Sequence, residues 1–205
     1  MNIIKYPTEK DYPSICERPH LNVRELNTIV TGVLDDIKKR GDRAIIDYEE
    51  RFDHVRLSTL TISDDEINEA WENIDRSLRD AILLAHDNIR IFHESQKFKR
   101  QKVQTAEGVT CWQKSVPIQR VGLYIEEIVL CTPPDKEGRV NPAILVAAKV
   151  AGVSRIIKAG GIQAIGAMAY GTETVPKVFK VFGPGNQYVM AAKQHVSLHD
   201  VAIDM

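Results

Sequence analysis

The stretch SRIIKAGGIQAIGAMAYG, Ser154–Gly171, joins a short apolar run to a helical pattern through two adjacent glycines. The run around Ile156 is typical of a buried strand, and the pattern that follows predicts a helix from Ile162 to Tyr170. Similar apolar runs begin near Ile128 and Val178. Each interval between runs has room for one strand, one helix and two short loops, which is the rhythm of right-handed parallel βαβ units.

Two glycine-rich turns stand where predicted strands pass into helices. They are Ala159–Gly161 (AGG) and Gly183–Gly185 (GPG), followed by Gln163 and Asn186 respectively. Ligands of parallel α/β sheets bind beyond the carboxyl ends of the strands, where glycine permits close approach and a helix start offers free N–H groups. The two amide side chains are therefore candidates for contacts with a nucleotide.

A purely structural interpretation of these turns stays open. Glycine-rich turns occur in α/β proteins simply to reverse the chain, and Asn186 is a good helix cap. Neither turn has the spacing of the familiar nucleotide motifs, G-x-G-x-x-G and G-x-x-x-x-G-K-[ST]. The residues alone predict an α/β protein with a ligand-binding edge and do not identify the ligand.

From Leu21 to about Lys97 the pattern predicts helices, and nothing in them is arranged for chemistry. Gly41 is placed to end a first helix and Asp42 to cap a second one. The sequence Ser63–Glu66 (SDDE) predicts a capping box that opens a further helix. One apolar stripe on the first helix comprises Leu26, Ile29, Val30, Val33, Leu34 and Ile37.

Composition excludes several classes of function. The 205 residues carry 27 basic and 28 acidic side chains, so no net field attracts nucleic acid or an anionic membrane surface. No apolar run reaches the length of a membrane span, and the N-terminus does not have the pattern of a signal peptide. Three scattered cysteines fit reduced thiols, so we expect a cytoplasmic protein.

Six segments together resemble the histidinol dehydrogenase family, in the family's order and over nearly the whole chain. Two lie upstream and four in the second half of the chain. They are KKRGDRAIIDYEERFD (Lys38–Asp53), NIRIFHESQ (Asn88–Gln96), VGLYI (Val121–Ile125), GGIQAIGAMAYGTETVPKV (Gly160–Val178), FGPGNQYV (Phe182–Val189) and VAIDM (Val201–Met205).

The resemblance implies an NAD-dependent, zinc-requiring enzyme that oxidises L-histidinol to L-histidine through the aldehyde, the last step of histidine biosynthesis. It also implies a homodimer. By motif match, the family's NAD-contacting residues fall on Tyr124 in VGLYI, Gln163 in GGIQAI and Asn186 in FGPGN. Without the resemblance, Tyr124 would be interpreted as an ordinary aromatic residue of a strand.

The sequence departs from the family in two places. After Ile125 the family continues into a Pro-Gly-Gly loop and a long apolar helix, whereas here Glu126 follows directly, and we expect a segment to be missing at this point. The family's zinc ligands and its proton-transferring glutamate–histidine pair lie beyond the position of Met205. No catalytic residue and no metal ligand is therefore assigned in this chain, which is predicted to be inactive alone.

The predicted fold class is α/β, with a helical N-terminal region followed by a Rossmann-like parallel βαβ domain that is incomplete relative to the family. Residues 1–115 are expected to form the mainly helical region with part of a first α/β domain. Residues 116–200 are expected to form the NAD-binding domain, and residues 201–205 to begin the return into the first domain.

Three further interpretations stay open. His195 and His199, with Asp200 adjacent, have a spacing that can hold zinc, although surface positions on an amphipathic helix are the commoner reading. Cys131 is either a thiolate nucleophile of an aldehyde oxidoreductase or an unreactive cysteine buried in a strand. A non-catalytic dinucleotide-binding module derived from the same fold is the alternative to an enzyme. Asp204 receives no role from the sequence.

Overall fold

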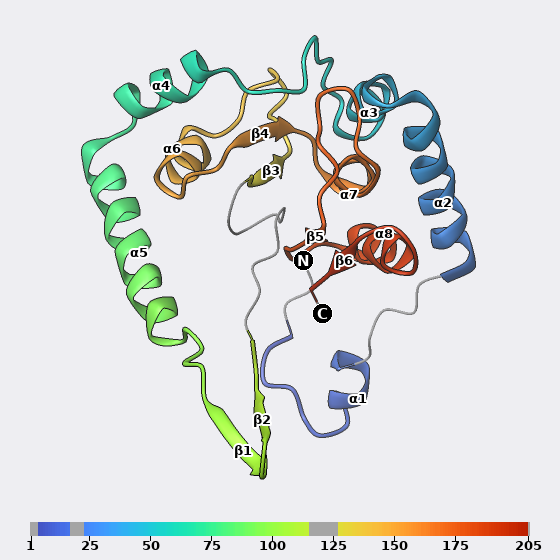
Figure 1. Cartoon of the computed structure of the whole chain (residues 1–205). Coiled ribbons are helices and arrows are strands. Elements are labelled where there is room, and N and C mark those ends of the chain that lie inside the picture. Colours follow the sequence, from blue (N-terminus) through green and yellow to red (C-terminus); the bar gives the residue numbers. More distant parts are fainter. Residues whose placement is uncertain (1–3, 17–22, 115–126, 205) are drawn as a thin grey trace.

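The computed structural model describes residues 4–16, 23–114 and 127–204 and shows a mixed α/β fold (Figure 1). The helices are α1 (Tyr12–Ile15), α2 (Val23–Arg40), α3 (Asp42–Tyr48), the π-helix η1 (Glu49–Asp53), α4 (Asp64–Asn73), α5 (Arg76–Ser95), α6 (Pro142–Val150), α7 (Gly161–Tyr170) and α8 (Gln187–Ser197). The strands are β1 (Lys102–Ala106), β2 (Val109–Trp112), β3 (Val129–Thr132), β4 (Arg155–Lys158), β5 (Lys180–Val181) and β6 (Ala202–Ile203).

Strands β3 and β4 form a parallel pair with helices on both sides (Figure 1). Val129 and Ile157 point into a core shared with α2, α3, α7 and α8, whereas Ile156 points into a second core shared with α4 and α6. Side chains alternate between the two faces of a strand, so burial on both sides requires the nearly continuous apolar runs that the sequence shows. Helix α6 is the crossover, which confirms the predicted βαβ unit.

The third predicted strand does not add to this pair. Strand β5 instead pairs in parallel with β6, with Lys180 opposite Ala202 and Val181 opposite Ile203. The described strands therefore form short separate pairs, with the segment from Gly171 to Phe179 between α7 and β5. The domain boundaries expected from the sequence stay predictions.

The N-terminal region also contributes to the β3–β4 sheet. Ile62 N–H donates to the carbonyl of Ile156 over 3.0 Å, and Lys158 N–H donates to the carbonyl of Leu60 over 2.7 Å. The segment thus lies antiparallel along β4, with an isolated bridge between Thr61 and Ile157. Sequence reasoning missed this contact, because three residues between loops carry no strand periodicity.

The helical pattern of the N-terminal region is confirmed, and so is its capping box. Ser63 Oγ accepts from Glu66 N–H over 3.2 Å, and Glu66 Oε2 accepts from Ser63 N–H over 2.9 Å. Gly41 follows α2 as predicted, with a φ of 56° that glycine adopts without strain.

The expectation that Asp42 caps α3 is wrong. Gly41 occupies the N-cap position, and the Asp42 side chain instead accepts a hydrogen bond of 2.5 Å from Thr172 Oγ1. Asp42 N–H donates to Glu173 Oε2 over 2.8 Å, so a distant carboxylate does the capping. A Cβ on Gly41 would lie 2.2 Å from that same oxygen, so the contact with Glu173 is a second reason for a glycine at this position.

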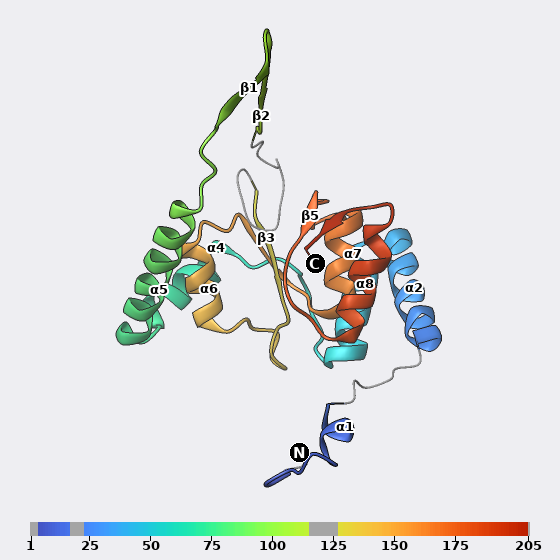
Figure 2. The same ribbon diagram turned by 90° about the horizontal axis from the view of Figure 1, so that it is seen from below.

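The antiparallel β1–β2 hairpin extends away from the layered part of the chain, whereas helix α5 lies beside α6 (Figure 2). No described residue of α5 is buried, and its exposed apolar side chains include Leu84, Ile89 and Phe92. The sequence did not predict the hairpin. Among the described residues, a search for a helix with the length and apolarity of a membrane span finds none.

Helices α2 and α7 approach closely at Gly166. A Cβ at this position would lie 2.9 Å from Ile37 Cδ1 and 3.0 Å from Leu34 Cδ2, and both of those side chains are buried. Gly32, on the exposed side of α2, has no atom within 4 Å of such a Cβ. The two glycines therefore form a matched pair for testing the packing.

Gly166→Val should lower the free energy of unfolding by about 1–3 kcal/mol, because the added methyl groups overpack the α2–α7 contact. Gly32→Val should change it by less than about 0.5 kcal/mol, since the substituted side chain faces open space. Urea unfolding followed by circular dichroism measures both values. Equal effects of the two substitutions would contradict the described packing.

Candidate functional site

The first glycine turn, between β4 and α7, is held by a carboxylate from the helical region. Glu49 Oε1 accepts from Gly160 N–H over 3.1 Å and from Gln163 Nε2 over 2.8 Å. Gln163 Nε2 also donates to Asp53 Oδ2 over 3.2 Å. Both carboxylates belong to η1, so one turn of π-helix, a conformation common at functional sites, contacts the carboxyl edge of the sheet.

Glu49 is an ionisable group without access to solvent. Its side chain is 0% exposed, and among the described residues its Oε2 is buried with no hydrogen-bond partner. Burial raises the pKa of Glu49 to about 7. The hydrogen bonds from Gln163 and Gly160 act to lower this pKa, and the nearby charge of Asp53 acts to raise it. The carboxyl group therefore titrates near neutral pH.

A cation lies at the end of β4. Lys158 is 8% exposed, and its Nζ donates to Glu66 Oε1 over 2.7 Å. Although burial acts to raise the pKa of Glu66, the hydrogen bonds from Lys158 and from Ser63 outweigh it and lower that pKa. Glu66 thus joins the capping box of α4 to the carboxyl edge of the sheet.

The second glycine turn, between β5 and α8, is fixed by a buried lysine. Lys193 is 2% exposed, and its Nζ donates to the carbonyl of Gly183 over 3.0 Å and to Asp204 Oδ1. Asp204 Oδ2 accepts from Gly183 N–H over 3.1 Å. The hydrogen bond from Lys193, and then that from Gly183, lower the pKa of Asp204. The structure thus gives Asp204 a role that the sequence did not reveal.

The predicted NAD-contacting residues have different surroundings. Gln163 is 1% exposed and engaged with η1. Asn186 is exposed and caps α8, because its Oδ1 accepts from Tyr188 N–H over 3.0 Å and from Val189 N–H over 3.1 Å. Tyr124 and the junction between Ile125 and Glu126 lie outside the described residues.

Each glycine turn is secured separately. Helices α7 and α8 pack against each other, and both contribute buried apolar side chains to one core, Ile165 and Ala192 among them. No hydrogen bond or ion pair joins residues 160–163 to residues 183–186 in the described part of the chain. That both turns hold one ligand stays a prediction.

Sequence reasoning missed Glu49 and Asp53, although one signal was present. Glu49 lies four residues after Ile45 and so continues the buried face of the helical segment that precedes it. A carboxylate on an apolar helix face needs a partner, but the sequence does not say that the partner is Gln163, more than a hundred residues away.

The other candidate residues gain no support from the structure. His195 and His199 are both exposed, and His199 lies beyond the end of α8. No group of three or more His, Cys, Asp or Glu side chains able to hold a metal ion occurs among the described residues. Burial, and secondarily the charge of Glu49, raise the pKa of Cys131 to about 12, so its thiol stays protonated at neutral pH.

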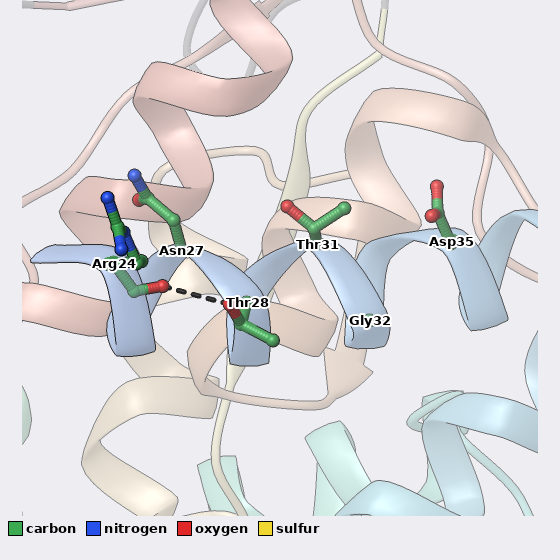
Figure 3. A pocket seen from close by; sticks show the side chains of 6 residues that line it. All are labelled: Arg24, Asn27, Thr28, Thr31, Gly32 and Asp35. Carbon is green, nitrogen blue, oxygen red and sulfur yellow. Dashed lines mark hydrogen bonds between the residues drawn. The ribbon is translucent and has the colours of Figure 1, made fainter.

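One hollow in the described structure lies away from both glycine turns. It is an open depression of ≈ 740 Å³ along the outer side of α2, drawn in Figure 3. Its lining residues all belong to this helix: Arg24, Asn27, Thr28, Thr31, Gly32 and Asp35. Thr28 Oγ1 donates to the Arg24 carbonyl over 2.9 Å. A face of one helix, away from the strand ends, offers no convergent set of groups for chemistry.

Stability should depend on pH through Glu49. Its pKa lies above the ordinary 4.5 in the folded chain, so the folded chain retains a proton that the unfolded chain releases. The contribution of this proton to the free energy of unfolding is complete below about pH 4.5 and is lost as the pH rises towards 7. The groups that face Glu49 are Asp53 on η1, Cys131 on β3, and Gly160 and Gln163 at the turn.

Glu49→Gln removes this titration. The free energy of unfolding of this variant minus that of the unsubstituted chain should increase by about 1–3 kcal/mol from pH 4.5 to pH 8. Urea unfolding at each pH measures both values. Glu50→Gln, an exposed neighbour on the same helix, is the control and should show no such rise. A difference for Glu49→Gln that is constant with pH would contradict the assignment.

Thiol reactivity should separate the three cysteines. Cys16 and Cys111 are exposed, whereas Cys131 is partly buried with a raised pKa. A chromogenic disulfide reagent should therefore modify two thiols rapidly in the native chain and the third only after unfolding, because the thiolate is the reacting form. In Cys131→Ser the slow phase should vanish. Three equally fast thiols would restore Cys131 as a nucleophile candidate.

Comparison with known proteins identifies the family. The family model described as Histidinol dehydrogenase matches residues 16–126 and 125–205. The histidinol dehydrogenase of Bacteroides thetaiotaomicron is 52% identical over 100% of this chain and 53% of its own length. That of Methanocaldococcus jannaschii is 38% identical over 98% of this chain and 52% of its own length.

A solved structure agrees. The crystal structure of histidinol dehydrogenase from Elizabethkingia anophelis matches with a TM-score of 0.87 and 42% identity, over 97% of this chain and 51% of that chain. This chain thus spans about half the length of the relatives it matches. The family match falls into two pieces that meet at residues 125 and 126, where the sequence predicts a missing segment. The chain belongs to the histidinol dehydrogenase family.

Proposed function

We propose that this chain is the NAD-binding part of a histidinol dehydrogenase, the enzyme that oxidises L-histidinol to L-histidine through the aldehyde. The observation that carries the proposal is the 52% identity to a histidinol dehydrogenase over the whole chain. The fold supports it, since the strand–turn–helix at Gly160–Gln163 has the location at which parallel α/β sheets bind nucleotides. The same identity does not favour a non-catalytic module.

The residues proposed to contact NAD are Tyr124, Gln163 and Asn186. Asn186 uses its Oδ1 to cap α8, which leaves its Nδ2 as a hydrogen-bond donor for a ligand at the helix start. Gly161, with a φ of 56°, and Gly183, with a φ of 128°, keep side chains out of both turns. Bound NAD would accept a hydride from the substrate carbon.

Zinc and the proton-transferring groups are assigned to the part of the family's sequence that has no counterpart here. The described residues contain no cluster suited to a metal ion, and they are not proposed to hold zinc. Their proposed task is to bind and orient the dinucleotide. On this account the chain alone binds NAD without oxidising L-histidinol.

Membership of the family is also the basis for proposing an oligomeric state and a cellular location. We propose a cytoplasmic homodimer, for which the exposed apolar side chains of α5 offer a contact surface. A solution mass of one chain, 23.1 kDa, would contradict the dimer.

Asn186→Asp tests the site because it separates capping from ligand binding. Aspartate caps a helix as well as asparagine does, so the melting temperature should stay within a few degrees. Affinity for NAD, measured by isothermal titration calorimetry, should fall by about tenfold because the Nδ2 donor is lost and a negative charge is added.

Unchanged affinity in Asn186→Asp would remove Asn186 from the proposed contacts. A parallel assay adds L-histidinol, NAD and zinc to the unsubstituted chain and follows absorbance of NADH at its characteristic wavelength. No turnover is expected. Turnover by the 205-residue chain would contradict the assignment of the chemistry to residues outside it.

A further inference from the structure

The side-chain amide of Gln163 is oriented by two carboxylates. Its Nε2 donates to Glu49 Oε1 over 2.8 Å and to Asp53 Oδ2 over 3.2 Å. A primary amide nitrogen has two N–H groups, and both are used here. Glu49 Oε1 also accepts from Gly160 N–H, so it stays an acceptor whether or not Oε2 carries a proton. Because an amide oxygen cannot donate, the acceptors Glu49 Oε1 and Asp53 Oδ2 permit only this orientation of the group.

Gln163 is only 1% exposed, and this orientation leaves its carbonyl oxygen as the side-chain atom that a ligand at the turn would meet. No hydrogen bond to this Oε1 occurs within residues 4–16, 23–114 and 127–204. The oxygen lies beside the backbone of the glycine turn, since a Cβ on Gly161 would be 3.0 Å from it. Gly161 therefore keeps the space in front of this acceptor clear.

The local charge selects the kind of group that this acceptor meets. Asp53, and Glu49 when it is ionised, place negative charge within hydrogen-bond distance of this amide, so a phosphate would be repelled from the Gln163 side of the turn. A neutral hydrogen-bond donor is not repelled. The dinucleotide offers such donors in its ribose hydroxyls and in the carboxamide of its nicotinamide ring.

We propose that Glu49 and Asp53 are positioning residues: they fix the Gln163 amide so that its carbonyl oxygen accepts a hydrogen bond from a neutral donor of NAD. This inference rests on the proposed function, because it requires that the turn binds NAD. It goes beyond the Gln163 contact itself by assigning which atom of Gln163 binds and which residues hold that atom in place.

A double-mutant cycle separates this role from a merely structural one. Glu49→Met and Gln163→Met each keep side-chain volume while removing the hydrogen bonds, and both are compared with the double variant by calorimetric titration with NAD. Each single variant should bind NAD about tenfold more weakly. The double variant should bind no more than about twofold more weakly than Gln163→Met, because Glu49 acts through Gln163.

Two further variants sharpen the result. Glu49→Gln retains a carbonyl acceptor for Gln163 and should stay within about threefold of the unsubstituted affinity. Glu50→Met makes the matched change at the exposed neighbouring residue and should leave the affinity unchanged. Melting curves of every variant show that each is folded. ADP-ribose, which lacks the nicotinamide, is titrated beside NAD.

The outcomes are distinct. Losses that also occur with ADP-ribose assign the donor to a part of the ligand other than the nicotinamide, and losses confined to NAD assign it to the carboxamide. Unchanged affinity in Glu49→Met, or losses that multiply in the double variant, overturn the positioning role alone. No binding of NAD by the unsubstituted chain overturns the proposed function and the positioning role together.

Discussion

The parallel pairing of β3 with β4 is the interaction on which the rest of the described structure depends. The two strands are only four residues long, and helices cover both of their faces. Their register aligns Thr132 with Lys158, so both strands end at one edge. The glycine turn at Gly160 can begin only there, and α7 must then run back against α2 at Gly166, where a side chain would not fit.

The helical N-terminal region does more than cover the sheet. It adds the segment around Thr61 along β4, and it directs two carboxylates to the strand ends. Glu66 pairs with Lys158, which offsets the cost of burying the ammonium group. Glu49 has no cationic partner among the described residues, and its burial carries a cost that an apolar residue would avoid. A costly carboxyl group beside the proposed ligand-binding turn is better explained by its effect on Gln163 than by stability.

Much of the fold was predictable because it is encoded locally. Capping at Ser63, the helix end at Gly41 and the crossover through α6 all follow from periodicity and turn chemistry, and the structure confirms them. The partners of β5, of Asp42 and of Asp204 were not predictable, because each depends on a contact between segments far apart in the chain. Neither propensity nor spacing specifies such contacts.

The candidate site likewise combines features that are visible in the sequence with contacts that only the structure reveals. The glycine turns and the amides of Gln163 and Asn186 were visible in the sequence, and the resemblance named the family that the comparisons then supported. The carboxylates that hold Gln163 were not visible. A helix pattern shows that Glu49 faces inward but not what it meets there, so its role becomes evident only when α7 is placed against η1.

The most direct test of the central claim is a crystal structure of this chain with NAD bound. The account predicts a ribose hydroxyl or the carboxamide of NAD within about 3 Å of Gln163 Oε1, with Nε2 still donating to Glu49. A dinucleotide bound away from residues 160–163, or contacted through Gln163 Nε2 after the amide has left Glu49, would contradict it.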